Sequence, residues 1–265
     1  MPYPIKRAIA AAVMTLAAAS VMAAAPKPTI VLVHGAFAGS SSWNGVVAEL
    51  SQQGYPVIAA ASPLRGVASD GAYVAALARS VNGPVVLVGH SYGGAVISAA
   101  ANGLPQVKAL VFVAAFAPDQ GESALALTGK FPGSTLPPTL AAPVKLDDGG
   151  EDLYVQQDKF PQQFAADVPL AQAQAMAATQ RPIKAAALSE GAPAPAWKAI
   201  PSWAIYGNAD LNIPPRAMGF MAERAKARKT VVVKGGSHAL MVSRPREVAA
   251  LIEDAARSVS GDTDR

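Results

Sequence analysis

The fold is decided by residues 85–94, which read VVLVGHSYGG. The first four form a continuous apolar run rich in β-branched side chains, which is typical of a strand covered on both faces. Gly89, Ser91 and Gly93 then form a Gly-x-Ser-x-Gly pattern, and the small residues that follow predict a helix to about Asn102. This context predicts a sharp turn that exposes the Ser91 hydroxyl at the carboxyl edge of a parallel sheet.

Strands and helices alternate on both sides of this turn. Further apolar runs predict strands at residues 29–33, 57–60, 109–117, 202–206 and 230–233. Amphipathic spacing and terminal signals predict helices at residues 43–53, 69–81 and 245–258. The alternation predicts an α/β fold with a doubly wound, mostly parallel sheet.

Residues 119–200 have a different character. Nine of the 22 prolines fall in this segment, and no long apolar strand is evident in it. Because loops of this length without internal structure are uncommon, the segment is predicted to be a helical cap inserted into a core of residues 26–118 and 201–260. Its helices are expected within residues 151–160 and at residues 169–179.

Both chain ends are predicted to lie outside this domain. Lys6 and Arg7 precede an Ala-rich apolar run that ends in small residues, the pattern of a secretory signal peptide over residues 1–25. Cleavage after Ala23 and cleavage after Ala25 both fit that pattern, and the expected location is periplasmic or secreted. Residues 261–265 are expected to be a frayed polar tail.

Composition excludes several classes of protein. Without Lys6 and Arg7 the 22 basic residues become 20 against 18 acidic ones, a net charge of +2, so charge gives no support for a nucleic-acid partner. The absence of cysteine excludes disulfides, thiolate metal sites, a cysteine nucleophile and a lipidated cysteine anchor. We expect no metal, no organic cofactor and no stable membrane anchor.

Three histidines are candidates for the base that a serine nucleophile requires. His34 ends the first strand and His90 lies inside the turn, positions that favour structural or oxyanion-loop roles. His238 follows the last predicted strand in a glycine-containing loop. We therefore predict His238 as the base. The alternative is that His238 is a surface loop histidine without a catalytic role.

Two aspartates are candidates for the acid that orients this base. Asp210 directly follows the strand at residues 202–206 and gives the order serine, acid, histidine along the chain. Asp119 also follows a strand and is the alternative. We favour Asp210 because of that order; helix capping or a turn is the non-catalytic role of either residue.

An oxyanion formed at Ser91 needs backbone donors. The residue after the nucleophile, Tyr92, supplies one N–H, and the second is expected from Ala36, with Phe37 as the alternative. Aromatic residues near the nucleophile or in the cap are expected to contact the substrate, together with the histidine of the turn: Phe37, Trp43, His90 and Trp197.

Four motifs carry a family resemblance: residues 33–37 (VHGAF) followed by Trp43, residues 89–94 (GHSYGG), residues 115–119 (AFAPD) and residues 235–238 (GGSH). With them the sequence resembles the α/β-hydrolase superfamily, and within it plant methyl-ester esterases, hydroxynitrile lyases and bacterial esterase-like proteins.

The resemblance implies a catalytic triad of Ser91, Asp210 and His238, an oxyanion hole from Ala36 and Tyr92, and a cap over an apolar pocket. The lyases carry lysine after the triad histidine, whereas this chain has Ala239, so cyanohydrin cleavage is not expected.

The expected function is hydrolysis of small to medium apolar carboxylic esters through an acyl-enzyme. Lactones, thioesters and perhydrolysis would use the same groups. The alternative from a different class is a receptor that binds a small ligand and turns it over slowly or never.

Overall fold

The computed structural model describes residues 27–259. The predicted signal peptide and polar tail lie outside the described residues. A central sheet of six strands has the order β2-β1-β3-β4-β8-β9, and every neighbouring pair is parallel. The strands are β1 (Thr29–Val33), β2 (Val57–Ala60), β3 (Val85–His90), β4 (Val107–Val113), β8 (Ser202–Gly207) and β9 (Lys229–Val233).

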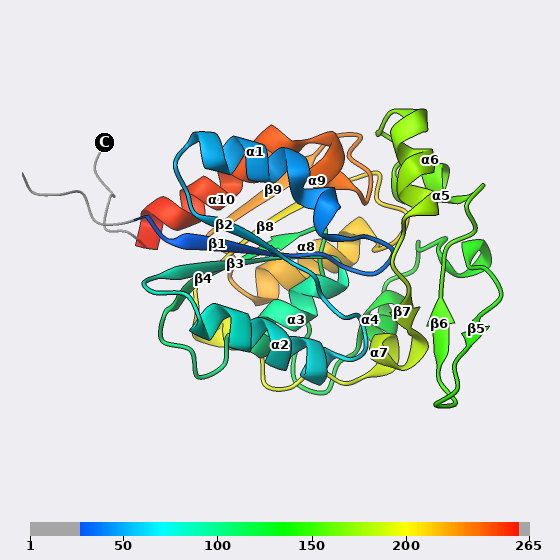
Figure 1. The fold of residues 1–265 in the computed structure, drawn as a ribbon, viewed down its shortest axis with the longest axis horizontal. Coiled ribbons are helices and arrows are strands. Elements are labelled where there is room, and N and C mark those ends of the chain that lie inside the picture. Colours follow the sequence, from blue (N-terminus) through cyan, green and yellow to red (C-terminus); the bar gives the residue numbers. More distant parts are fainter. Residues whose placement is uncertain (1–26, 260–265) are drawn as a thin grey trace, which may run out of the picture.

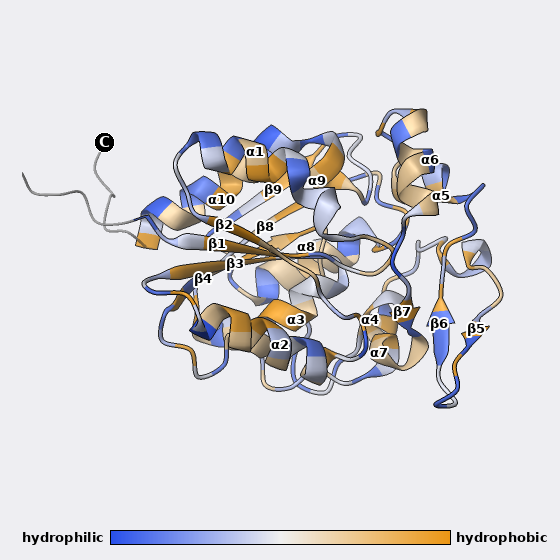
Figure 2. Cartoon of the chain, viewed as in Figure 1, coloured by the Kyte–Doolittle hydropathy of each residue, from blue (hydrophilic) through white to orange (hydrophobic). Residues whose placement is uncertain are grey.

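The predicted doubly wound parallel sheet is therefore confirmed. All six residues of β3 and of β8 are buried, as a continuous apolar run in a covered strand requires. Figure 2 shows the same strands as mainly hydrophobic. One boundary differs from the prediction: β4 ends at Val113 rather than near residue 117, because Ala114 takes a positive φ of 43° and the chain leaves the strand there.

Helices cover both faces of the sheet. α1 (Asn44–Gln52) and α10 (Pro245–Val259) lie on one face, and α2 (Val67–Arg79) and α3 (Tyr92–Ala100) lie on the other (Figure 1). The chain also forms the short helices η1 (Ser40–Trp43) and α9 (Leu240–Ser243), and α8 (Pro215–Arg224), which packs against β8. The sequence analysis did not anticipate α8 or α9.

The cap insertion (residues 119–200) joins β4 to β8 and lies at one end of the sheet (Figure 1). Its helices are α4 (Ala124–Lys130), η2 (Pro137–Thr139), α5 (Phe160–Phe164), α6 (Leu170–Ala178), α7 (Ala185–Ser189) and η3 (Ala196–Lys198). It also holds a small antiparallel sheet of β5 (Val144–Lys145), β6 (Glu151–Leu153) and β7 (Ile183–Lys184).

The expected helix at residues 169–179 is present as α6, with Pro169 as its N-cap residue. The helix expected within residues 151–160 is wrong, since this stretch begins with β6 and α5 starts only at Phe160. The reason is pairing on both sides: Asp152 lies opposite Val144 of the preceding strand and opposite Lys184, which is distant in sequence. β6 is also largely hydrophilic (Figure 2), so it lacked an apolar strand pattern.

Three contacts hold the cap insertion against the loop before α2 and the first residues of α2. The Lys184 N–H donates to the Leu64 carbonyl (3.0 Å), and the Arg65 guanidinium pairs with Asp152 (2.6 Å). The Glu190 carboxylate accepts hydrogen bonds from the N–H groups of Val67 and Ala68 at the start of α2. A carboxylate satisfies the unpaired N–H groups of a helix start and its positive dipole end. The cap thus has a defined position on the core.

Candidate active site

Ser91 sits on the strained turn between β3 and α3, at φ 53° and ψ −123°. The flanking glycines are required by close packing. A β-carbon at Gly89 would lie 2.5 Å from the Gly93 carbonyl oxygen, and one at Gly93 would lie 2.5 Å from that of Val33 in β1. The turn can therefore be tight enough to raise Ser91 at the end of β3, as the Gly-x-Ser-x-Gly pattern predicted.

Asp210 and His238 meet at the ends of β8 and β9. His238 Nδ1 lies 2.7 Å from Asp210 Oδ2, and both side chains are buried. The other carboxylate oxygen, Oδ1, accepts the N–H groups of Asn212 (2.8 Å) and Ile213 (3.0 Å). Because a carboxylate only accepts, the proton of a neutral His238 is on Nδ1 and its Nε2 is an acceptor.

The alternative acid, Asp119, is occupied elsewhere. Its carboxylate pairs with the Lys198 ammonium at 2.6 Å, and this hydrogen bond lowers the pKa of Asp119. The structure therefore places Asp210, and not Asp119, beside His238.

A contact between Gly207 and Gly236 lets the segments that carry Asp210 and His238 approach each other. The sequence analysis did not predict this contact. A β-carbon at Gly207 would overlap the carbonyl oxygen of Gly236. The Ala209 N–H also donates to that carbonyl (3.1 Å). A glycine at the end of β8 and another shortly after β9 were the available signal, and their approach brings Asp210 within reach of His238.

The loop after β1 lies against the turn that carries Ser91. A β-carbon at Gly35 would lie 2.6 Å from Ser91 Cβ and 3.1 Å from the Tyr92 nitrogen. The Phe37 N–H donates to the Arg181 carbonyl of the cap (3.0 Å), whereas the Ala36 N–H has no backbone acceptor within residues 27–259. Tyr92 starts α3, so its N–H has no acceptor within that helix. Ala36 and Tyr92 thus present backbone donors beside Ser91.

Ser91 and His238 line one cavity of about 120 Å³, here called the apolar cavity. Cap leucines supply much of its wall: Leu125, Leu136, Leu140 and Leu188. From the core it is lined by Ala36, Phe37, Tyr92 and Ile213, among others. Such a volume is comparable to the cavity of about 150 Å³ that holds benzene in a protein core. The leucines belong to segments whose structure the sequence did not predict, which is why they were missed.

Of the four residues expected to contact substrate, only Phe37 lies on this wall. Trp43 is fully buried, and the centroid of its ring lies 6.4 Å from that of the His90 ring in an edge-to-face arrangement. Trp43 therefore packs against the turn that carries Ser91. Trp197 donates from Nε1 to the Pro118 carbonyl (3.0 Å) and lies beside the Arg224 guanidinium. Trp43, His90 and Trp197 are therefore corrected from substrate contacts to packing residues.

His34 and His90 are held neutral by burial. Burial lowers the pKa of His34 to about 4, and burial together with the neighbouring His238 lowers the pKa of His90 well below its usual value. His90 Nε2 lies 3.0 Å from the His238 carbonyl oxygen, which only accepts, so Nε2 donates. His90 thus fixes the main chain of His238, which lines the same cavity as Ser91, consistent with a structural role.

The cap insertion also holds the loop of His238. The Phe164 carbonyl accepts the Ala239 N–H (3.0 Å), and the Phe164 ring lies edge-to-face with the His238 ring at 4.9 Å. The Ser237 hydroxyl donates to the Asp167 carboxylate. Residues on both sides of His238 are therefore bonded to one short stretch of the cap, around α5.

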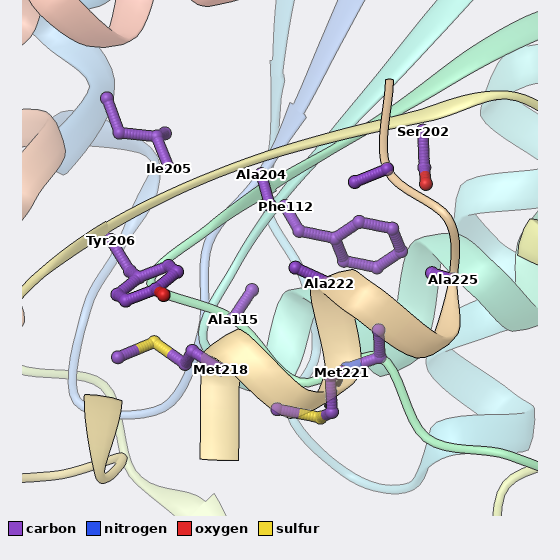
Figure 3. Close-up of a pocket in the computed structure, with 12 residues that line it drawn as sticks. Phe112, Ala115, Ser202, Ala204, Ile205, Tyr206, Met218, Met221, Ala222 and Ala225 are labelled. Atoms are coloured by element: carbon purple, nitrogen blue, oxygen red, sulfur yellow. Dashed lines mark hydrogen bonds between the residues drawn. The ribbon is translucent and has the colours of Figure 1, made fainter. Parts of the chain in front are cut away.

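A small void also lies between the sheet and α8, and Ser91 does not line it. Phe112, Met218 and Met221 line it, as Figure 3 shows, and its volume is about 10 Å³. This volume is about that of one water-sized probe. The void is a packing gap and not a ligand site.

Residues 27–259 contain no group of three or more histidines or acidic residues that could hold a metal ion. In the same residues no helix has the length and apolar character needed to cross a bilayer.

A model of the alpha/beta hydrolase family matches residues 30–251. The protein therefore belongs to the α/β hydrolase family. A carbendazim hydrolyzing esterase from Nocardioides sp. (strain SG-4G) is 34% identical over 125 residues, which cover 42% of this chain and 50% of that protein. The match thus spans about half the length of this curated relative.

Solved structures share the fold. Polyneuridine aldehyde esterase superposes with a TM-score of 0.75 at 20% identity, covering 86% of this chain and 98% of that one. An extracellular α/β-hydrolase from a Paenibacillus species gives 0.70 at 24% identity (87% and 99% covered). A pyrethroid hydrolase from Sphingobium faniae JZ-2 gives 0.69 at 23% identity (88% and 99% covered). At these identities the likeness establishes the fold.

Proposed function

We propose that the protein hydrolyses carboxylic esters of small to medium apolar substrates through an acyl-enzyme on Ser91. The observation that carries the proposal is the buried Asp210–His238 pair at 2.7 Å, with His238 lining the same cavity as Ser91. The relatives named as esterases and as a pyrethroid hydrolase support ester cleavage as the reaction class.

The chemistry follows from the groups at the cavity. His238 Nε2 accepts the hydroxyl proton as Ser91 Oγ attacks the ester carbon, and Asp210 stabilises the resulting imidazolium. The N–H groups of Ala36 and Tyr92 stabilise the oxyanion. When this tetrahedral intermediate collapses, the bond between the ester carbon and the alcohol oxygen breaks. The alcohol leaves with the proton from His238. Water then attacks the acyl-enzyme and gives a proton to His238. As the bond from the acyl carbon to Ser91 Oγ breaks, His238 returns this proton to Ser91 Oγ, and the acid is released.

Ser91→Ala tests the proposal, because alanine removes only the nucleophile. Hydrolysis of p-nitrophenyl butanoate should fall by about 10⁴-fold or more, as for loss of a triad member. Ser98→Ala is the matched control: Ser98 is a buried serine of α3 whose hydroxyl has no hydrogen-bond partner among the described residues. It should retain activity within about twofold, as expected away from the chemistry.

The substrate range is tested with esters of graded acyl length, a lactone and a thioester. Hydrolysis confined to long-chain lipids or polymers would contradict a cavity of about 120 Å³. A folded protein that binds esters without multiple turnover would favour the slow receptor instead.

We also propose that the protein is exported after removal of residues 1–25. The basic and then Ala-rich start of the chain supports this. N-terminal sequencing of the protein from a secreting host should find a start at residue 24 or 26, whereas an intact start in the cytoplasm would refute it.

A further inference from the structure

A second cavity, of about 180 Å³, lies on the surface between η1 and α6 and shares Phe37 with the apolar cavity. We call it the polar cavity. Six of the side chains that line it are hydroxyls or amides: Ser41, Ser42, Asn44, Gln172, Thr179 and Gln180. No charged side chain lines it. Phe37, Ala38, Met176 and Val242 line it as well, so its wall is mixed, and it is more polar than the leucine wall of the apolar cavity.

Three of these polar side chains already have partners. The Gln180 amide is bonded at both ends to the main chain of Val155, and the Thr179 hydroxyl donates to the Ala175 carbonyl. The Ser42 hydroxyl accepts the Gly39 N–H at 3.4 Å. Part of the hydrogen-bonding capacity of these three side chains is therefore already used within the protein.

The other three are exposed and have no side-chain hydrogen bond to another residue within 27–259: Ser41, Asn44 and Gln172. Hydroxyl and amide groups both donate and accept, so they complement neutral polar groups such as alcohols and amides. The nearby Arg181 guanidinium is directed to the Ser62 carbonyl at 3.3 Å. The cavity thus offers hydrogen bonds and no net charge.

We infer that the polar cavity binds the alcohol part of the substrate, and that this part is neutral and carries hydroxyl or amide groups. The inference rests on the proposed ester hydrolysis. The acyl part stays on Ser91 during the first half-reaction and fits the cavity under the cap leucines. The alcohol departs first, and exposed Asn44 and Gln172 place the polar cavity at the solvent.

Phe37 separates the two cavities. Its side chain is buried and its ring packs edge-on against Phe164 at 6.5 Å. The bond from its N–H to the Arg181 carbonyl fixes its main chain. Phe37 is the lining residue that the two cavities share, and the proposal places the two parts of an ester on either side of its ring.

A matched pair of substrates tests the inference. 2,3-Dihydroxypropyl butanoate and propyl butanoate share an acyl group and an alcohol carbon count, and differ only in two hydroxyls. We expect kcat/KM to favour the dihydroxypropyl ester by about tenfold or more, because each hydrogen bond gained is worth about threefold to tenfold.

Matched variants locate the effect. Gln172→Leu and Asn44→Leu should each lower the ratio of kcat/KM for the dihydroxypropyl ester to kcat/KM for propyl butanoate by about threefold to tenfold. Gln174→Leu is the control, since Gln174 is an exposed glutamine of the same helix α6 but does not line the polar cavity. It should change neither substrate.

Equal kcat/KM for the two esters, or equal effects of Gln172→Leu and Gln174→Leu, would overturn the inference while leaving ester hydrolysis intact. A preference for hydroxyls only when they are on the acyl side would overturn the assignment to the alcohol. Failure to hydrolyse propyl butanoate and p-nitrophenyl butanoate at all, with Ser91→Ala indistinguishable from the parent, would overturn the proposed function and this inference with it.

Discussion

The carboxyl edge of the sheet and the cap insertion meet at the same cavity, but they are held in place differently. At the edge, Ser91, Asp210 and His238 each follow a strand of the parallel sheet, so hydrogen bonds of the sheet position the chain that carries them. The cap is held by contacts between residues distant in sequence, such as Arg65 with Asp152. We infer that the edge performs the chemistry and that the cap aligns it. Substitutions at the edge should therefore cost far more activity than those in the cap.

After replacement of the proposed nucleophile, the largest effect is expected at the proposed acid. Asp210→Asn should lower kcat by about 10³- to 10⁴-fold, because an amide in this position favours the wrong tautomer of His238. Asp119→Asn is the control, since Asp119 pairs with Lys198, and it should stay within about twofold. Kinetics on p-nitrophenyl butanoate measure both. If Asp119→Asn were the crippling change, the acid would have been assigned to the wrong strand.

Gly35→Ala should have the next largest effect. A β-carbon there would press on Ser91 Cβ at 2.6 Å and move the loop that presents the Ala36 N–H. Loss of an oxyanion donor typically lowers kcat by about 10²- to 10³-fold. Gly129→Ala in α4 is the control, because a β-carbon at Gly129 meets nothing within 4 Å. Similar activity of the two variants would show that the loop after β1 does not stabilise the transition state.

A smaller effect is expected where the cap supports the base. Ser237→Ala removes the bond to Asp167 beside His238, and should lower kcat by about threefold to tenfold with little change in KM. Ser237→Thr keeps a hydroxyl and should restore most of the loss, which a purely steric role would not explain. Ser243→Ala serves as control, since the Ser243 hydroxyl has no partner among the described residues. A change confined to KM would instead assign Ser237 to substrate binding.

The smallest effect concerns stability at the join between cap and core. A hydrogen bond from Arg224 lowers the pKa of the Glu122 carboxyl, against the opposing effect of burial. A lowered pKa stabilises the fold above the unfolded value of about 4.3, and this contribution is lost as pH falls through the folded value. The pair is partly exposed, so its contribution is below about 1 kcal/mol.

Urea unfolding of the parent and of Glu122→Gln measures this contribution. Their free energies of unfolding should differ near pH 7 and converge in acid. Glu223→Gln, at an exposed position of α8, is the control. A difference that grows as the pH falls would have the opposite sign and contradict the cause given.

The features that the sequence predicted best are formed by residues close together in the chain. The turn at Ser91 could be predicted because strand, glycines and helix adjoin in ten residues, and packing at Gly89 and Gly93 leaves no room for side chains. Asp210 and His238 were placed by their positions after strands. Trp43 was misplaced, because its sequence position near the turn does not show that its ring packs underneath against His90.

The cap could not be predicted to the same depth. β6 has three residues and lies between β5 and the distant strand β7, so no periodicity within residues 151–153 indicates it. The leucines of the apolar cavity come from α4, from α7 and from the two positions that flank η2, and only the folded cap brings them together. The contact of Phe164 with His238 also depends on that arrangement.

The strained turn has a consequence for how this protein can evolve. Non-glycine residues in such sparsely populated backbone regions cost on the order of 1 to 3 kcal/mol, and Ser91 stands there at φ 53° and ψ −123°. Glycine would adopt this conformation with less strain, so replacing Ser91 by glycine would remove the nucleophile and relieve the fold in one step. Thermal stability and the proposed catalytic activity therefore favour different residues at position 91. A gene copy under no selection for activity would gain stability if its serine were replaced by glycine.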